Sequence, residues 1–535
     1  MCPDESHENH PPIQPHCCPC CDHSEESQGD RGGVSRRGFI GGVSGIAMAG
    51  LSWSALSAAQ VKQSSGEPSA EPAPPRKTLV VKPIFVYSVY QRRPQTSWRP
   101  WGGIQTQADA DKEVKNITAE LKALESRADF PVKFQNVAAV QDQKAVAALK
   151  ADTSPDVYLI YAAGGSMPTL TDAIGLADAK DKDAIVFLRH RSGPVYLWYE
   201  IMSPRYLRRH SDKLAVENID FDDVVVDNQD DILWRLRALC GLRNTVGSRI
   251  LAVGGPGAWA QPKGKVDKLV KDRWQLDVRT ITYNDLGKLI EAARKDQAAV
   301  KDAKNRAAAY LKTPGTKLET KLPFVENAFL LESIFRALMK KADCRAMTIN
   351  SCMGTIMPMS QTTACLPLST LNDDGYLAFC ESDFVVIPSG ILLGSISGCP
   401  TFLNDPTHPH HNMITLAHCT APRRMDGKTL EPASIMTHFE SDYGAAPKVD
   451  MHVGQELTCI APDFDAKRWL GLSAEIVAHP LLPICRSQID VKFKADSDTV
   501  AKHMPGFHWM VIYGNYLREA GYALKRVGIE WENLG

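Results

Sequence analysis

Residues 156–165, DVYLIYAAGG, place an unbroken apolar run directly before a pair of glycines. Such a run, rich in β-branched and aromatic residues, is typical of a strand covered on both faces, and the glycines permit a tight loop after it. Further strand-like runs occupy 79–87 and 184–188, and apolar residues recur at helical spacing over 110–127. Strands that alternate with helices predict βαβ units and a parallel sheet with helices on both faces.

A second unit of this kind begins at 249–255, RILAVGG. Its other expected strands are 277–281, 347–350, 377–380 and 385–387, and its expected long helices are 283–310 and 324–341. The GGPG stretch at 254–257 follows the first of these strands. Because it lacks the G-x-G-x-x-G spacing and no Lys-Ser/Thr pair follows it, an ordinary strand-to-helix turn is favoured over a nucleotide loop.

The pattern changes from residue 401 onward. Segments 414–417, 448–459 and 489–493 are short, β-rich and broken by Gly, Pro and Asp, and a helix over 515–526 closes the chain. The fold class expected is α/β, with two Rossmann-like parallel-sheet domains followed by a β-rich C-terminal domain. The expected boundaries are a leader at 1–60, a Pro/Ser/Glu-rich linker at 61–77, α/β domains at 78–245 and 246–397, and the β-rich domain at 398–535.

Composition limits the classes of function. A chain of 535 residues is too long for one ordinary core, and 44% hydrophobic with 23% charged residues excludes disorder over most of its length. Its 61 Lys and Arg against 62 Asp and Glu give a net charge of −1. No net field therefore recruits nucleic acid or anionic lipid, and a multidomain globular protein such as an enzyme is expected.

The N-terminus has the features of an export signal. Residues 35–40, SRRGFI, open a stretch without charges over 39–59, which ends in small residues at 55–58. Paired arginines before such a stretch resemble a twin-arginine signal, which is an address and not an anchor. We therefore expect a periplasmic protein with no stable membrane insertion after export; an uncleaved N-terminal anchor is the alternative.

Cysteines fall into two groups. Residues 16–23, HCCPCCDH, could bind zinc or copper, but no second cluster at zinc-site spacing follows, and cleavage of the signal would remove the segment. The nine later cysteines are odd in number and scattered. They do not suggest a disulfide framework, and most are expected to be small buried hydrophobes.

Carboxylates and imidazoles gather late in the chain. The candidates are Glu381, Asp383, Asp405, His418, His438, Glu440 and His508. Glu381 and Asp383 lie two apart at an expected strand end, so both would point the same way if the strand were regular. Several lie beside apolar strands, where burial of a charge requires a partner. Together they are the donor set of a divalent first-row metal with open positions; loops rich in Asp and His, as at 408–411, are the alternative.

From Cys380 onward the order of these residues resembles the L-arabinose and L-fucose isomerase superfamily. The stretch 378–383, AFCESD, is similar to the Ala-Gly-Glu-Gly-Asp stretch of the arabinose branch, whose glutamate would be Glu381; the fucose branch uses the aspartate, which would be Asp383. The stretch 402–405, FLND, is similar to the family's Phe-Met-Glu-Asp, with Asn404 in place of the glutamate. Either Asp405 substitutes for it or the metal is held differently.

The resemblance extends to the histidines and implies an activity. His418 matches the histidine of the following strand, and 507–511, FHWMV, matches the terminal motif with His508 as the one histidine retained of a pair. The family build is two α/β domains and a barrel-like third domain, assembled as trimers or hexamers. The implied function is aldose–ketose isomerisation of a sugar through an enediol, with a divalent metal such as Mn²⁺.

In that scheme the metal ligands are Glu381, Asp405, His418 and His508. Proton transfer between C2 and C1 falls to Glu381 with Asp405 or Asp383 as the catalytic pair. The expected substrate-facing residues are His438, Glu440, Trp98 and Arg99. The last two lie in 96–103, TSWRPWGG, which could form a sugar-stacking lip or an ordinary anchored loop.

Two other functions stay open. An exported, non-catalytic carbohydrate-binding protein on the same scaffold is consistent with Asn404 and the export signal. A metal-dependent hydrolase ranks last, because no zinc-hydrolase signature such as H-E-x-x-H is present.

Overall fold

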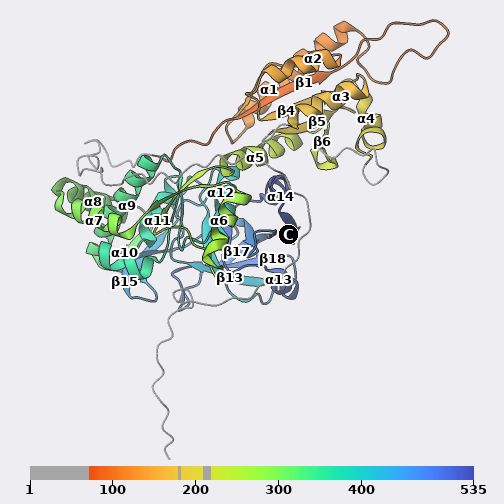
Figure 1. Ribbon diagram of the computed structural model, residues 1–535. Coiled ribbons are helices and arrows are strands. Elements are labelled where there is room, and N and C mark those ends of the chain that lie inside the picture. The colour runs from red at the N-terminus through yellow and green to blue at the C-terminus, as the bar shows by residue number, and fades with distance from the viewer. Residues whose placement is uncertain (1–71, 179–181, 209–218) are drawn as a thin grey trace, which may run out of the picture. The chain divides into compact units, whose positions relative to one another are not determined.

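The computed structural model describes residues 72–178, 182–208 and 219–535 (Figure 1). The twin-arginine stretch, the Cys/His-rich leader and most of the expected linker lie outside these residues. Within the described ranges, no helix has both the length and the apolar character needed to cross a membrane.

The first sheet is entirely parallel. It comprises β1 (Leu79–Val86), β2 (Val132–Phe134), β3 (Ala138–Val140), β4 (Val157–Ala162), β5 (Asp183–Leu188) and β6 (Val224–Val226). The strand order is β2-β1-β4-β5-β6, with β3 beside the second half of β1. This is a doubly wound order whose direction reverses between β1 and β4.

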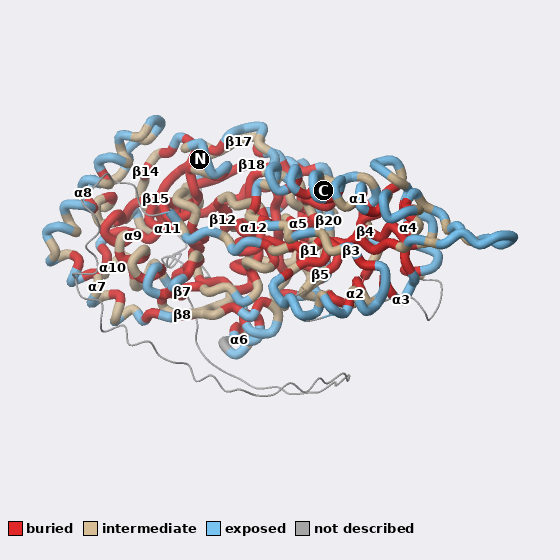
Figure 2. Tube along the Cα trace, turned by 90° about the horizontal axis from the view of Figure 1, so that it is seen from above, coloured by how far each residue is buried: buried red, intermediate tan, exposed pale blue. Residues whose placement is uncertain are grey.

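Helices cover both faces of this sheet (Figure 1). They are α1 (Gln107–Arg127), α2 (Gln143–Ala148), α3 (Met167–Ile174), α4 (Leu197–Ile201) and α5 (Gln229–Thr245). Alternate residues of β1 divide between two cores: Val81 and Phe85 pack with α1 and α5, whereas Ile84 and Val86 pack with α2, α3 and α4. Because both faces are covered, β4 is buried at every residue and most residues of β1 and β5 are buried, as Figure 2 shows in red.

The second sheet is also parallel, with the order β11-β10-β7-β8. Its strands are β7 (Arg249–Val253), β8 (Asp277–Ile281), β10 (Ala346–Ile349) and β11 (Leu377–Phe379). The accompanying helices are α6 (Lys263–Asp272), α7 (Tyr283–Lys295), α8 (Gln297–Leu311), α9 (Leu322–Ala342), α10 (Cys352–Ser360), α11 (Cys365–Asp373) and α12 (Ile387–Ser397).

The strand expected at 385–387 is wrong, because α12 begins there. Pro388 lies in the first turn of α12, where the proline φ suits a helix start. Every residue of 387–396 is buried, so α12 is apolar all round and carries no helical period that the sequence could show.

The C-terminal region forms a closed antiparallel barrel of six strands, which confirms the α/β class with a β-rich final region. The strands are β12 (Phe402–Pro406), β13 (Met413–His418), β16 (Glu456–Pro462), β17 (Arg468–Ala478), β18 (Ser487–Phe493) and β19 (Trp509–Tyr513). Pairing of β16 with β17 closes the barrel, and β20 (Glu530–Asn533) extends β17 in parallel. A separate sheet, ordered β15-β14-β9, consists of β9 (Thr316–Leu318), β14 (Ala433–His438) and β15 (Tyr443–Val449). The remaining helices are α13 (Ser497–His503) and α14 (Leu517–Arg526).

All nine cysteines after the leader are free thiols, and six of them are buried. This confirms the expectation that they form no disulfide framework.

The single helix expected over 283–310 is wrong, because the chain breaks at Asp296 into α7 and α8. The Asp296 carboxylate accepts hydrogen bonds from the amides of Ala298 (2.8 Å) and Ala299 (3.3 Å), which makes it the N-cap of α8.

We expect Asp296→Ala to lower the free energy of unfolding by about 1 kcal/mol, because the first amides of α8 lose their acceptor. Hydrogen exchange of the α8 amides measures this change, because denaturation of the whole chain would mix several transitions. Asp302→Ala removes an exposed carboxylate from the interior of the same helix, and it should change stability by less than about 0.5 kcal/mol. Equal losses in the two variants would contradict a capping role for Asp296.

Candidate metal centre

The centre begins at the C-terminal ends of the second sheet's strands, where ligand sites of parallel sheets usually lie. After β11 the backbone does not continue as a regular strand, since Glu381 and Ser382 have φ of 66° and 49°. Ser382 donates its amide to Thr348 Oγ1 (3.1 Å) and its hydroxyl to the carbonyl of Gly255 (3.1 Å). The turn that carries Glu381 is therefore fixed to β10 and to the loop that follows β7. The strand is not regular at Glu381, so the condition under which Glu381 and Asp383 would point the same way is not met.

The barrel supplies the other side of the centre through the register of three adjacent strands. In β12, Asp405 lies opposite Ala417 of β13, so it is next to His418. Its neighbour Asn404 lies opposite Trp509 of β19, which directly follows His508. Antiparallel pairing thus brings one carboxylate and two imidazoles from distant parts of the chain to one end of three strands.

Four side chains converge. Glu381 Oε2 lies 3.1 Å from His508 Nε2, and Glu381 Oε1 lies 3.5 Å from His418 Nε2. Asp405 Oδ1 lies 3.2 Å from the same His508 Nε2. The structure therefore brings together Glu381, Asp405, His418 and His508, and it is Asp405, not Asn404, that reaches the cluster; the Asn404 amide instead donates to the carbonyl of Phe402 (3.0 Å).

These contacts fit donors around a cation better than they fit hydrogen bonds. Among the described residues, His508 Nε2 and Asp405 Oδ1 are buried atoms that have no hydrogen-bond partner, although they lie close together. Ligands bound at about 2.1 Å and at right angles to one another are separated by about 3 Å. Two carboxylates and two imidazoles at such separations satisfy the donor chemistry of a divalent first-row ion.

The cluster is open on its carboxylate side. The side chains of His508 and His418 are 0% and 4% exposed, whereas those of Glu381 and Asp405 are each 31% exposed. The two histidines therefore lie deeper than the two carboxylates, which are the side of the cluster that reaches solvent.

The surroundings shift the pKa of all four side chains. Burial lowers the pKa of His418, but the Glu381 and Asp405 carboxylates outweigh it and raise the value to about 9. Burial likewise opposes protonation of His508, yet Asp383 and Glu381 raise its pKa well above the usual value. Burial raises the pKa of Asp405; Glu381 is buried too, but its contacts with the two histidines lower its pKa. The pKa values of the two carboxylates are thus shifted in opposite directions.

Asp383 lies on the far side of the His508 ring from the cluster. Its Oδ2 accepts a hydrogen bond from His508 Nδ1 (2.6 Å), and its Oδ1 accepts from the amides of Trp259 (3.1 Å) and Val385 (3.0 Å). A carboxylate on Nδ1 fixes the tautomer that leaves Nε2 free to bind a metal. In this geometry Asp383 orients a ligand and does not join the four converging groups.

We expect Asp383→Asn to weaken Mn²⁺ binding by about 10- to 100-fold, because the amide no longer fixes the His508 tautomer. Equilibrium titration followed by electron paramagnetic resonance measures the affinity. The control is Asp490→Asn in β18, which alters a comparable hydrogen bond from the Thr415 hydroxyl (2.6 Å) elsewhere in the barrel. Unchanged affinity in Asp383→Asn would show that Asp383 does not orient His508.

His438 and Glu440 lie near the cluster without entering it. His438 is buried, and burial together with the charges of His418 and Arg486 lowers its pKa to about 4. Glu440 is exposed and close enough to raise the pKa of Asp405. Both positions suit residues that would contact a substrate bound at the carboxylates.

Trp98 and Arg99 lie in the loop between β1 and α1. The Arg99 guanidinium stands 5.0 Å from the centre of the Trp98 ring, and the nearby Trp101 is 68% exposed. Gly103 anchors the end of the loop by donating to the carbonyl of Val195 (2.7 Å). Within the described part of the chain, no hydrogen bond, ion pair or ring contact joins Trp98 or Arg99 to the cluster.

Sequence reasoning missed Cys380. With Glu381 and His418 it forms a group whose donor atoms lie within 4.8 Å of one another. Its Sγ lies 3.8 Å from Cys352 Sγ, and this contact and burial raise its pKa well above the usual value for a thiol. Cys380 is therefore a further candidate donor beside Glu381 and His418. A lone cysteine that directly follows the apolar strand 377–379 gave no signal beyond that of a core residue.

An aromatic group beside the centre was also missed. The rings of Trp259 and Phe507 stack at 4.1 Å and 13°, with Phe464 5.8 Å from Trp259. Phe507 also meets the His508 ring edge-on at 4.7 Å. All three aromatic residues are half-buried, so they offer an apolar wall next to the opening.

The fold and the cluster define a class: an α/β protein with two parallel sheets and a closed barrel, whose sheet and barrel jointly present a carboxylate–imidazole centre. Comparison with protein-family models and with curated proteins gives no match for the chain.

Proposed function

We propose that this protein is a metal-dependent aldose–ketose isomerase, similar to the L-fucose and L-arabinose isomerases, that acts on a small sugar with Mn²⁺ as its cofactor. The observation that carries the proposal is the convergence of Glu381, Asp405, His418 and His508. Among the residues that the structure describes, the buried atoms His508 Nε2 and Asp405 Oδ1 have no hydrogen-bond partner. A set of two oxygens and two nitrogens that leaves ligand positions open suits a Lewis acid that must also bind substrate oxygens.

Each residue has a separate role that follows from its position in the cluster. A bound divalent ion would polarise the carbonyl and hydroxyl oxygens of the sugar. Glu381 and Asp405 are the two carboxylates of the cluster. Glu381 would accept the C2 proton, and Asp405, whose pKa is raised by burial, would donate a proton at C1. His418 and His508 would bind the ion from the buried side of the cluster. The hydrogen bond to Asp383 keeps His508 in the tautomer whose Nε2 can bind a metal. The pKa separation of two carboxylates is the arrangement that acid–base exchange through an enediol needs.

The proposal includes assembly and location. We propose a periplasmic homo-oligomer, a trimer or hexamer, exported by the twin-arginine route. The loop with Trp98 and Arg99, which has no contact to the cluster within the described chain, would face sugar bound at the centre of a neighbouring copy.

Proton exchange at C2 tests the activity. With Mn²⁺ in D₂O, the protein should exchange the C2 proton of one or more pentoses or 6-deoxyhexoses and form the ketose, as seen by ¹H NMR. Removing the metal with EDTA should stop exchange, and restoring Mn²⁺ should recover it. Exchange that is absent for every such sugar, or that continues after metal removal, refutes the isomerase.

The aromatic wall favours a second candidate, a non-catalytic carbohydrate-binding protein. Trp259 and Phe507 can contact the apolar face of a sugar ring without a metal. This candidate predicts that a sugar raises the melting temperature of the protein by the same amount with and without EDTA, and that no ketose forms. The isomerase instead predicts stabilisation that depends on the ion.

A further inference from the structure

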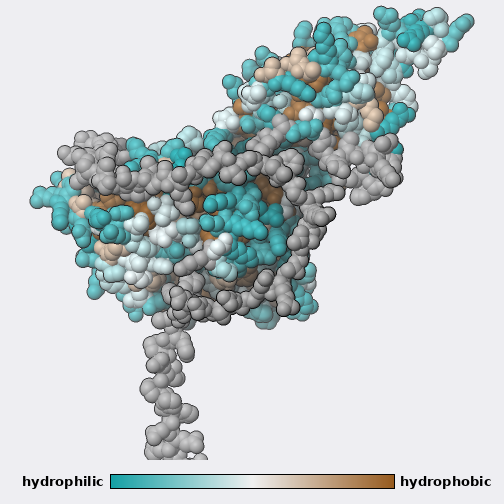
Figure 3. Space-filling model, in the orientation of Figure 1, coloured by the Kyte–Doolittle hydropathy of each residue, from teal (hydrophilic) through white to brown (hydrophobic). Residues whose placement is uncertain are grey.

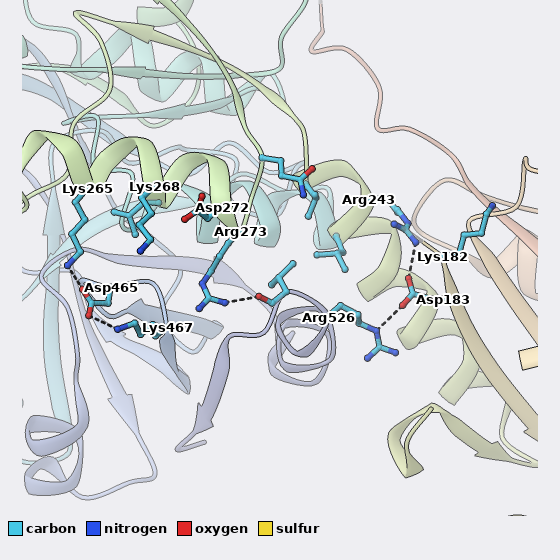
Figure 4. A pocket seen from close by; sticks show the side chains of 15 residues that line it. Lys182, Asp183, Arg243, Lys265, Lys268, Asp272, Arg273, Asp465, Lys467 and Arg526 are labelled. Atoms are coloured by element: carbon cyan, nitrogen blue, oxygen red, sulfur yellow. Dashed lines mark hydrogen bonds and ion pairs between the residues drawn. The ribbon is translucent and has the colours of Figure 1, made fainter. Parts of the chain in front are cut away.

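A second concave site lies away from the metal centre. It is a cavity of about 860 Å³ bounded by the start of β5, by residues along α6 and just beyond it, and by the C-terminal ends of α5 and α14 (Figure 4). The loop before β17 completes the wall. None of the four converging residues of the metal centre lines it. The volume lies in the range of ordinary small-molecule sites.

The lining is strongly cationic. Seven Lys and Arg side chains line the cavity against three carboxylates, those of Asp183, Asp272 and Asp465, an excess of four positive charges. The whole chain carries a net charge of −1, so this excess is local. Figure 3 shows the surface over α6 as hydrophilic, in keeping with the charged residues of that helix.

Two of the carboxylates are each shared between two cations (Figure 4). Asp183 accepts from Arg243 (3.0 Å) and from Arg526 (3.1 Å), and Asp465 accepts from Lys265 and from Lys467 (3.1 Å). One negative charge therefore faces two positive charges in each group. These pairings hold the cations in place before any ligand arrives, which lowers the entropy lost on binding.

Two further cations of the lining, Arg273 and Lys268, have no carboxylate partner among the described residues. Arg273 donates to the carbonyls of Val527 (2.9 Å) and Gly528 (2.7 Å), which are neutral acceptors. Lys268 is exposed and, in the described ranges, has no hydrogen-bond or ion-pair partner. Arg243 Nε is buried and lacks a hydrogen-bond partner among the same residues. Figure 4 shows Lys268 and Arg273 on the side of α6 that faces the cavity.

Two structural effects offset part of the excess. Asp223, outside the cavity, also pairs with Arg526 (2.5 Å). The C-terminal ends of α5, α6 and α14 each contribute a partial negative charge of about one half. After both are counted, the cavity keeps a net positive charge. The Lys and Arg side chains therefore outnumber the negative charges of the carboxylates and helix ends around them.

We infer that this cavity binds a small polyanion bearing phosphate groups. Guanidinium groups bind phosphate oxygens in pairs, and lysines add point charges, so the mixed lining suits two or more adjacent phosphates better than one carboxylate. Occupancy of the cavity would bridge α5, α6 and α14. The inference is independent of the proposed function.

Titration calorimetry with inorganic pyrophosphate tests the inference on the full chain, in buffer containing EDTA so that no cation at the metal centre contributes. We expect saturable 1:1 binding that weakens between 50 and 200 mM salt, with no binding of acetate at equal ionic strength. Lys268→Glu should lower the affinity by about tenfold, since it reverses a charge at the wall.

Lys271→Glu is the matched control, because it makes the same change at an exposed position of the same helix outside the cavity lining. It should lower the affinity by less than about twofold at 150 mM salt. Glu381→Gln should bind pyrophosphate as the unmodified protein does, which separates this site from the metal centre. Absence of pyrophosphate binding, or equal losses in Lys268→Glu and Lys271→Glu, would overturn the inference.

Discussion

Replacing Glu381 with glutamine is expected to abolish tight Mn²⁺ binding and to slow C2 proton exchange by about 10²- to 10⁴-fold. Glu381 is the one side chain whose two oxygens reach both histidines, with Oε2 3.1 Å from His508 Nε2 and Oε1 3.5 Å from His418 Nε2. Glutamine keeps one acceptor oxygen but turns the other position into an NH₂ donor that faces an imidazole nitrogen. The variant therefore loses a ligand, a negative charge and the proposed base together.

Metal titration and NMR exchange on the same samples separate these losses. Saturating Mn²⁺ should restore occupancy of Glu381→Gln in part but not its exchange rate, because the amide cannot accept the C2 proton. Glu475→Gln is the matched control, since it makes the same change at an exposed position of the barrel strand β17. If Glu381→Gln bound Mn²⁺ and exchanged C2 protons as Glu475→Gln does, the centre would not be the metal site.

Most of the fold could be predicted from the sequence, because many of its strands have a pattern that is easily recognised. Parallel strands covered on both faces form continuous apolar runs, such as 157–162 and 184–188, that few other structures produce. The two errors have local causes. Asp296 fits the helical period of its neighbours, so the sequence does not show that its carboxylate caps a new helix. Segment 387–396 is apolar on every side, so it has no helical period to recognise.

Only part of the candidate centre could be predicted from the sequence. Residue types and order pointed to Glu381, Asp405, His418 and His508, but their convergence depends on strand register, which one sequence does not reveal. The turn after β11, with Glu381 in a left-handed conformation, has no local signal either. The orienting role of Asp383 appears only once the His508 ring is placed between it and Glu381.

Replacing Arg189 with methionine is expected to destabilise the first α/β domain by about 3–5 kcal/mol. The Arg189 side chain is fully buried, and its guanidinium donates to Glu113 (2.6 Å) and Glu120 (2.7 Å) of α1. Tyr196 donates to the same Glu113 oxygen (2.5 Å), and the Glu113 side chain is only 1% exposed. Methionine fills similar volume but leaves a buried carboxylate without its cation.

Hydrogen exchange of the β4 and β5 amides measures the loss within this domain, where denaturation of the whole chain would mix several transitions. Arg127→Met removes an arginine of α1 itself, but the two side chains of its ion pair with Asp230 are 53% and 69% exposed, so the cost should stay below about 1 kcal/mol. Adding Glu113→Gln to Arg189→Met should recover part of the loss, because no uncompensated charge then stays buried. If the double variant lost the sum of the two single effects, the penalty would come from lost packing around Arg189, and the ion pair would contribute little to holding α1 against β5.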